Sequence, residues 1–159
     1  MPRQTSEHGE RAGGKTMRVQ IRRTGKVAFE AQTGEGTPPV RVDGPATLGG
    51  GDAGMRPMEL FLVSLATCSA MDVVMILDQQ RQPLEDLDIE VEGERADAVP
   101  AVYERIHLRF LASGDVAPNK LARAVALSAE KYCSVSRMLL PSVEVTHEAV
   151  LKSAAEDVR

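Results

Sequence analysis

The sequence predicts an α+β protein of one domain. Strand-like and helical patterns follow one another in the order three strands, one long helix, two strands, two helices and one strand. Runs of strands separated by helices are typical of α+β folds, whereas a doubly wound sheet alternates strand and helix. The 159 residues suffice for one sizeable core. We expect a disordered N-terminal tail at residues 1–16, a domain at 17–152 and a C-terminal tail at 153–159.

The first three strands are predicted to form an antiparallel meander. In residues 17–23, Val19 and Ile21 alternate with polar side chains, which is the period of a strand with one buried face. Similar runs at 26–32 and 40–43 follow across short turns. Connections this short join antiparallel neighbours.

The segment between these strands and the long helix, residues 44–56, is rich in glycine. Its five glycines predict a mobile loop. A phosphate-binding loop is the sharper alternative, but the Lys-Ser/Thr pair that a P-loop requires does not follow the glycines.

A long apolar helix, predicted over residues 57–82, is the central element of the chain. Between Met58 and Leu77, 15 of the 20 residues are apolar, and the polar ones are scattered around the helix. A helix of this kind is buried on nearly every face, and a partner subunit could help to bury it. A transmembrane helix is disfavoured, because Glu59 lies at its start and Asp72 in its interior.

The second half of the chain predicts a hairpin, two helical segments and a last strand. Apolar and charged residues alternate through 84–96 and 103–112, with an acidic outer row on the first strand and a basic one on the second. Opposite charges on neighbouring strands form favourable pairs. A helix at 118–133, a further turn at 135–140 and an alternating strand at 143–150 complete the pattern.

Charge and composition argue against several classes of partner. The net charge of −4 provides no basic face for nucleic acid or an anionic membrane, and aromatic residues make up 3% of the chain. The N-terminus has no apolar signal region. We therefore expect a cytoplasmic protein that binds neither nucleic acid nor membrane.

Two cysteines carry the candidate chemistry. Cys68 lies in the long apolar helix and Cys133 where the second helix is predicted to end, 65 residues later. In a chain without a signal peptide, such a pair is catalytic, redox-active or simply buried more often than it is a structural disulfide. Two thiols can form a disulfide where their Cα atoms lie within about 4.4–6.8 Å.

The context of both cysteines resembles a known family, the osmotically inducible protein C (OsmC) / organic hydroperoxide resistance superfamily, and in particular its OsmC-like branch. The resemblance spans roughly Met17 to Val150. It is carried by the segments PMELFLVSLATCSAMDVVMIL, IEVEGERA, HLRF, EKYCSV and VEVTH. It implies an OsmC-like fold in which antiparallel sheets wrap around long central helices, an intertwined homodimer, and two sites built by both subunits.

The same resemblance implies a thiol peroxidase acting on organic hydroperoxides. Cys68 would be the peroxidatic thiolate that becomes a sulfenic acid, and Cys133 the thiol that condenses with it to a disulfide. An external dithiol, typically lipoyl in this family, would reduce the disulfide. The reaction would need no metal and no cofactor of its own.

One part of the family pattern is altered in this chain. The best-studied members of the family carry an arginine that stabilises the thiolate and, ten positions before the reactive cysteine, a glutamate that holds this arginine. Here that position is Met58, with Glu59 beside it. Arg56 at the end of the glycine-rich loop, or Arg22 or Arg23 in the first strands, could supply the cation. Asp72, at i+4 from Cys68, would raise the pKa of the thiol. These departures leave two alternatives to the peroxidase: a non-enzymatic binder of small apolar ligands or a redox sensor, and a different thiol-based enzyme.

Overall fold

The computed structural model describes residues 16–152. Contacts divide them into two units, one ending at Arg56 and one beginning at Pro57. The tails predicted at either end lie outside the described residues, apart from Thr16. The prediction of one domain over 17–152 stays a prediction.

The first unit is built on a three-stranded antiparallel sheet, as the alternating patterns predict. Its strands are β1 (Gln20–Arg23), β2 (Ala28–Gln32) and β3 (Val40–Asp43), in the order β1-β2-β3. The register pairs Ile21 with Ala31, and Phe29 with Val42. One face of the sheet is therefore apolar, although Ile21 remains 68% exposed and Phe29 36% exposed.

The glycine-rich loop after β3 is organised by one buried carboxylate. Asp43 is 1% exposed and accepts hydrogen bonds from the backbone N–H groups of Gly51 and Ala53, each at 3.2 Å to Oδ2. The 3₁₀ helix η1 (Ala46–Leu48) lies in the same loop. The amide groups that could have cradled a phosphate are directed at a side chain of the protein itself, which argues further against a phosphate site.

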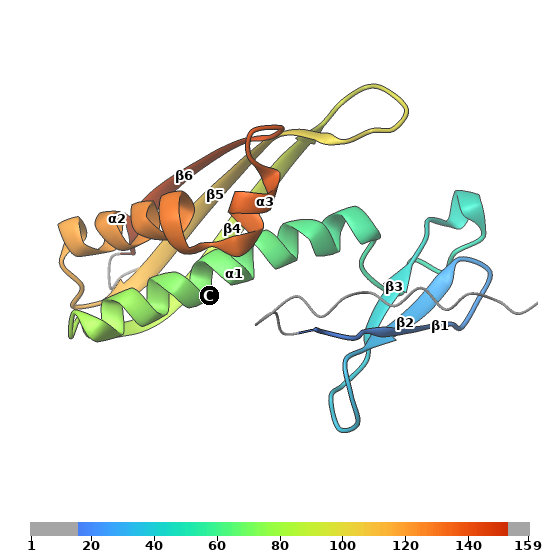
Figure 1. Cartoon of the computed structure of the whole chain (residues 1–159), viewed down its shortest axis with the longest axis horizontal. Helices are drawn as coiled ribbons and strands as arrows, with labels where there is room; N and C mark the ends of the chain where they lie inside the picture. Colours follow the sequence, from blue (N-terminus) through green and yellow to red (C-terminus); the bar gives the residue numbers. More distant parts are fainter. Residues whose placement is uncertain (1–15, 153–159) are drawn as a thin grey trace, which may run out of the picture. The chain divides into compact units, whose positions relative to one another are not determined.

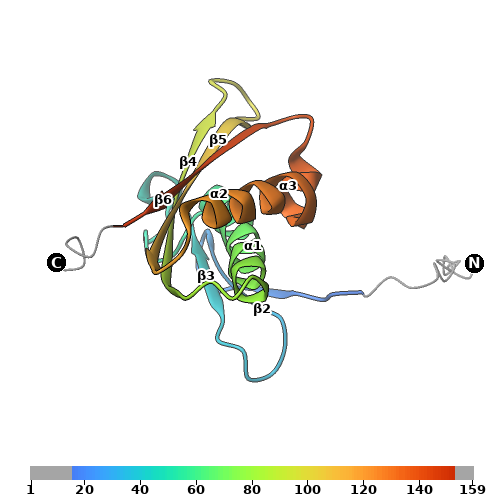
Figure 2. The same ribbon diagram turned by 90° about the vertical axis from the view of Figure 1, so that its left-hand side faces the viewer.

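The second unit packs three α-helices and a π-helix against a second three-stranded sheet. Its elements are α1 (Pro57–Gln79), β4 (Leu84–Arg95), β5 (Tyr103–Gly114), α2 (Pro118–Leu127), the π-helix η2 (Ser128–Tyr132), α3 (Ser134–Leu139) and β6 (Glu144–Leu151). The helices lie on one face of the sheet (Figures 1 and 2). The element order agrees with the predicted α+β class.

One feature of the sheets differs from the expectation of purely antiparallel pairing. In the order β4-β5-β6, the strands β4 and β5 form the predicted antiparallel hairpin, but β6 runs parallel to β5. The physical reason is the connection: α2, η2 and α3 carry the chain back across one face of the sheet before β6 begins. A helical crossover of this length returns the chain parallel to the strand it left.

The core of this unit lies between the sheet and the helices. Ile106, Leu108 and Phe110 of β5 are each 1% exposed, and Leu65, Val73 and Leu77 of α1 are fully buried. On the outer face, charged side chains join the strands: Arg109 donates to Glu90 of β4 at 2.7 Å and also to Glu148 of β6. The predicted division of the hairpin into an apolar and a charged face is confirmed.

The helix α1 is not buried on every side within this chain, contrary to the sequence-based expectation. Met71, Val74 and Met75 are 68%, 43% and 57% exposed. The periodicity explains the difference, because residues spaced three and four apart share a face of a helix, and only one face of α1 contacts the rest of its unit. Length and composition alone would allow α1 to cross a membrane, a test that core helices of soluble proteins also pass.

The Asp43 carboxylate gives the first prediction. Burial by itself raises its pKa, but the N–H groups of Ala53, Gly51 and Gly44, with Arg41 nearby, together hold the pKa below its ordinary value. A carboxyl whose pKa falls on folding stabilises the fold above its unfolded pKa, and that contribution disappears as the pH falls through the folded pKa. Asp43→Asn should therefore lower the melting temperature at pH 7, and the difference from wild type should shrink below about pH 4.

The control for this experiment is Asp52→Asn, in the same loop. Asp52 is exposed and pairs with Arg56, so its replacement should change stability by less than about 1 kcal/mol. A melting-temperature difference for Asp43→Asn that is equal at pH 7 and pH 3 would contradict the role given to the carboxylate.

Candidate functional site

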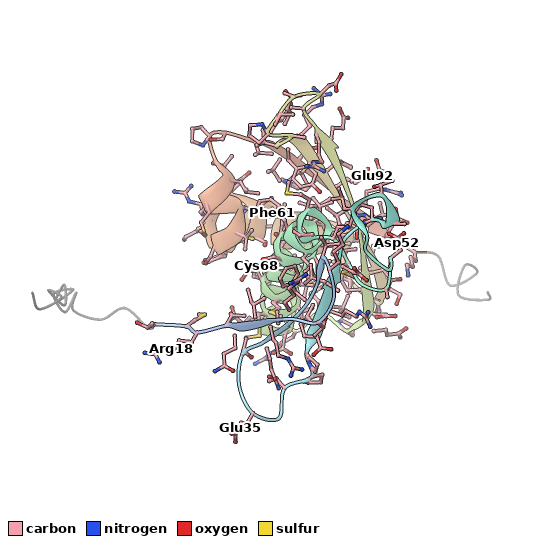
Figure 3. The ribbon with its side chains drawn as sticks, turned by 90° about the vertical axis from the view of Figure 1, so that its right-hand side faces the viewer. Arg18, Glu35, Asp52, Phe61, Cys68 and Glu92 are labelled. Atoms are coloured by element: carbon pink, nitrogen blue, oxygen red, sulfur yellow. The ribbon has the colours of Figure 1, made fainter. Side chains whose placement is uncertain are left out.

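The two cysteines, remote in sequence, lie next to each other in the second unit. Cys68 is half-buried in the middle of α1, two turns after Phe61 (Figure 3). Cys133 lies between η2 and α3 and is 0% exposed. Both thiols are free, and each is among the groups that shift the pKa of the other.

The position of Cys133 follows from how α2 ends. The α-helix gives way at Ser128 to the wider π-helix η2, after which Cys133 takes an extended conformation with φ −64° and ψ 109°. Its N–H group donates to the carbonyl of Ser128 at 2.9 Å. The sequence predicts a regular helix over 118–133, and the structure replaces its last turn with a π-helix, a feature that often marks functional sites.

A buried serine ties this π-helix to α1. The Ser128 hydroxyl donates to the backbone carbonyl of Ser69 at 3.1 Å and is also within 3.2 Å of an oxygen of Asp72. A hydroxyl group has one hydrogen to donate, so the Ser69 carbonyl oxygen and the Asp72 carboxylate oxygen share it. Ser128 thus holds the segment that leads to Cys133 against the helix that carries Cys68.

Sequence reasoning missed Ser128, although the pattern contains a signal. Leu121, Ala124, Val125 and Ser128 have the spacing of one helix face, and all four are buried. A serine at a core position of an apolar stripe needs a hydrogen-bond partner. That requirement points to a polar group on the facing helix, and here the group is Asp72. The carboxylate that was expected to oppose ionisation of Cys68 contacts Ser128.

The surroundings of Cys68 raise the pKa of its thiol. Burial raises the pKa of Cys68, and the Cys133 thiol beside it acts in the same direction. The backbone N–H groups of Val135 and Ser134 oppose this rise, but the pKa of Cys68 stays above its ordinary value. Within residues 16–152, the leading influences on this thiol do not include an arginine.

The surroundings of Cys133 act in the opposite direction. Burial alone would raise the pKa of Cys133, but the hydroxyls of Ser136 and Ser69, the N–H group of Ser136 and the Cys68 thiol together lower it below its ordinary value. The Ser136 N–H group lies 3.4 Å from the Cys133 sulfur. Ser69 and Ser136 are each 2% exposed, so these donors act in a site without bulk water.

Of the other predicted site residues, two belong to the first unit and one to the first turn of α1. Arg22 pairs with Glu30 at 3.2 Å and Arg56 with Asp52 at 2.6 Å, both inside the first unit. Glu59 lies in the first turn of α1, nine residues before Cys68, which is roughly 13 Å along the helix. Roles for these three residues at the thiols stay predictions.

The first turn of α1, which contains Met58 and Glu59, is anchored by an aromatic residue. The Tyr103 hydroxyl donates to the Met58 carbonyl at 2.8 Å, and its ring stacks on Phe61 with centroids 5.8 Å apart. Burial raises the pKa of Tyr103, and Glu59 adds to the rise. The ring also covers Gly93, where a Cβ atom would come within 2.4 Å of Tyr103. This end of α1 is fixed by packing and one hydrogen bond.

Hollows lie on two sides of α1. One, of about 540 Å³, is an open apolar groove lined by Thr67, Ala70, Met71, Val74, Met75 and Leu87. The other, of about 390 Å³, lies between the second half of α1 and η2 and is lined by Asp72, Met75, Ile76, Gln79, Gln80, Leu127 and Tyr132. The apolar groove includes the residue next to Cys68.

The chain combines two three-stranded sheets with a long apolar helix whose thiol lies beside a second thiol. This combination defines a class of protein. Residues 49–148 match the family described as OsmC-like protein, and the chain belongs to this family. The resemblance inferred from the sequence is therefore confirmed, as is the fold class.

Individual relatives agree with this assignment. Protein YhfA of Escherichia coli strain K12 is 44% identical over 98 residues, which are 61% of this chain and 73% of YhfA. A hypothetical protein from Aquifex aeolicus has a similar structure, with a TM-score of 0.74 and 32% identity over 88% of this chain and all of that one. An organic hydroperoxide resistance protein OsmC from Legionella pneumophila shares the fold, with a TM-score of 0.66 and 20% identity over 86% of this chain and 97% of that one.

The serine that ties η2 to α1 gives the second prediction. Ser128→Ala leaves a half-buried carboxylate and a carbonyl without their donor, which should lower the free energy of unfolding by about 1–3 kcal/mol in urea titrations. Oxidation of the reduced chain to the Cys68–Cys133 disulfide should also slow, because η2 is no longer held against α1. Ser142→Ala, at an exposed serine, is the control. Equal stability and equal oxidation rates in both variants would refute this role of Ser128.

Proposed function

We propose that the protein is a thiol peroxidase that reduces organic hydroperoxides to alcohols. The observation that supports this most directly is the pairing of a half-buried thiol with a fully buried one, both free and each close enough to shift the pKa of the other. Cys68 is the thiol that a substrate can reach, since Cys133 is 0% exposed. Family membership supports a role in defence against oxidants.

The proposed reaction has three steps. The Cys68 sulfur attacks the distal oxygen of the hydroperoxide, so that an S–O bond forms, the O–O bond breaks and the alcohol leaves with a proton. The Cys133 sulfur then attacks the Cys68 sulfenic acid, an S–S bond forms, and the hydroxyl leaves as water. An external dithiol, lipoyl by analogy with the family, reduces the disulfide by exchange. Reducing conditions such as those of the cytoplasm favour this cycle.

A second copy of the chain is the proposed partner. In the first unit, Ala28 is the buried apolar residue among those described, while Ile21, Phe29 and Val40 are 36–68% exposed on one sheet face. A small sheet of this kind needs another apolar surface to be stable. The exposed face of α1 offers a further apolar surface. Homodimerisation would bury such surfaces and surround Cys68 with apolar side chains, which suits alkyl or lipid hydroperoxides.

The third prediction tests the peroxidase. Cys68→Ser should abolish consumption of cumene hydroperoxide in the presence of a dithiol reductant, because the attacking sulfur is gone. Cys133→Ser should consume about one equivalent and then stop, because the sulfenic acid has no partner thiol. Consumption is followed by a peroxide assay, and mass spectrometry identifies the oxidised form of Cys68.

The Cys68→Ser, Cys133→Ser double variant is the baseline. If wild type consumes no more hydroperoxide than this variant, the peroxidase is excluded. The alternatives are then a non-enzymatic binder of small apolar ligands or a redox sensor, of which the sensor still requires a reversible Cys68–Cys133 disulfide.

The fourth prediction tests the partner. Met71→Glu places a charge on the exposed apolar face of α1 and should shift the chain from dimer to monomer in light scattering after gel filtration. Met138→Glu is the matched control, because Met138 is an 83% exposed methionine on α3, away from this groove. A wild-type chain that is monomeric at micromolar concentration would contradict the proposed dimer.

A further inference from the structure

The hollow between the second half of α1 and η2 has no part in the proposed thiol chemistry. Its volume is about 390 Å³, within the range of about 300–1,000 Å³ that is typical of small-molecule sites. Ile76 and Leu127 give it half-buried apolar walls, while Met75 and Tyr132, also in its lining, are 57% and 50% exposed. The hollow therefore combines an apolar wall with access from solvent.

Asp72 adds a carboxylate that the chain does not pair with a cation. Its side chain is half-buried in the lining of the hollow, and no salt bridge within residues 16–152 includes it. The Ser128 hydroxyl lies against Oδ2, which leaves Oδ1 as a further acceptor. Removing a charge from water is costly unless an opposite charge or hydrogen bonds compensate it. A cationic ligand would supply both.

Gln80 adds a second acceptor on the same side of the helix. The residues 72, 76 and 80 recur at intervals of four, and the Gln80 N–H group continues the helical pattern by donating to the Ile76 carbonyl at 3.1 Å. The Oε1 atom of Gln80 is buried and accepts no hydrogen bond in the described part of the chain. Buried acceptors without a donor are rare in folded proteins. The terminal torsion of a glutamine is soft, so its amide can turn this oxygen towards a donor in the hollow.

The polar groups of the hollow select one kind of ligand. Both Asp72 and Gln80 offer oxygen acceptors, so the ligand must donate hydrogen bonds, and the carboxylate favours a donor with a positive charge. The Tyr132 ring is suited to a cation as well, since the Lys131 ammonium lies 5.2 Å from its centre. A carboxylate ligand would be repelled, and a neutral apolar ligand would desolvate Asp72 without pairing it.

We propose that this hollow binds a small organic ammonium ion, with its nitrogen between Asp72 and Gln80 and its carbon skeleton against the apolar wall. The site goes beyond the proposed peroxidase and requires neither thiol. It is distinct from the apolar groove beside Cys68, with which it shares Met75.

Binding of benzylammonium to the full, reduced chain tests the proposal. In amide NMR spectra, its addition should shift the signals of Asp72, Gln80 and Tyr132 and reach saturation at millimolar concentration. Benzyl alcohol lacks the charge and benzoate reverses it, so each should bind at least about tenfold more weakly. The proposal fails if either binds as tightly as benzylammonium, if no saturation is reached, or if the shifts are confined to the groove around Thr67 and Ala70.

Asp72→Asn tests the charge. It should weaken benzylammonium binding by about tenfold or more, although the asparagine keeps an oxygen for Ser128. Asp78→Asn is the matched control, because it removes the same charge from an exposed residue of α1 outside the hollow and should leave the affinity unchanged. An equal loss in both variants would mean that the net charge of −4 attracts the cation without a site, and this would overturn the proposal.

Gln80→Met tests the second acceptor and does not depend on how well Asp72→Asn folds. Methionine has a similar length but no carbonyl oxygen, so the affinity for benzylammonium should fall several-fold while circular dichroism stays that of the wild type. Benzylammonium should also raise the melting temperature of the wild type, because it binds the folded chain alone, and the rise should be smaller in Gln80→Met. An unchanged affinity in the folded variant would overturn the position given to the nitrogen.

The variant with Cys68→Ser and Cys133→Ser separates this site from the peroxidase. It should consume no hydroperoxide and yet bind benzylammonium as tightly as the wild type. A weaker affinity in this variant would contradict a site that needs neither thiol. Absence of peroxidase activity in the wild type would leave the ammonium site standing.

Discussion

The arrangement of the two thiols depends on the hydroxyl of one buried serine. Ser128 directs its hydrogen at α1, where the Ser69 carbonyl and the Asp72 carboxylate accept it. Its own carbonyl accepts the N–H group of Cys133. The same residue therefore fixes the end of α2 to α1 and sets where the chain turns into α3. Apolar packing also holds the two helices together, but apolar packing is not directional.

Much of the fold could be predicted because its causes are local. The alternation in β4 and β5 predicts which side chains face the core, and Ile106, Leu108 and Phe110 are buried as expected. The apolar run around Cys68 likewise predicts the helix α1 close to its observed bounds. The parallel pairing of β6 was not predicted, because it depends on which way α2, η2 and α3 cross the sheet, a tertiary property without a local signal.

The candidate site could be predicted only in part. Both cysteines were identified from their contexts, but the donors around Cys133 were not, because Ser69 and Ser136 have no spacing that marks them as neighbours of one sulfur. Asp72 was placed at i+4 from Cys68, a position that also faces α2, and the structure shows its carboxylate in contact with the Ser128 hydroxyl. Whether the Asp72 side chain contacts Cys68 or a residue beyond α1 depends on how the segment after α2 packs against α1.

The opposite shifts of the two thiols have a consequence for redox thermodynamics. With the pKa of Cys133 lowered and that of Cys68 raised, there is a pH interval in which the reduced pair holds one proton and one negative charge. Within it, reduction of the disulfide takes up two electrons and a single proton. Its potential should then change by about 30 mV per pH unit, half the slope of an ordinary dithiol. The reduction potential of the pair would therefore change less with pH than that of an ordinary dithiol.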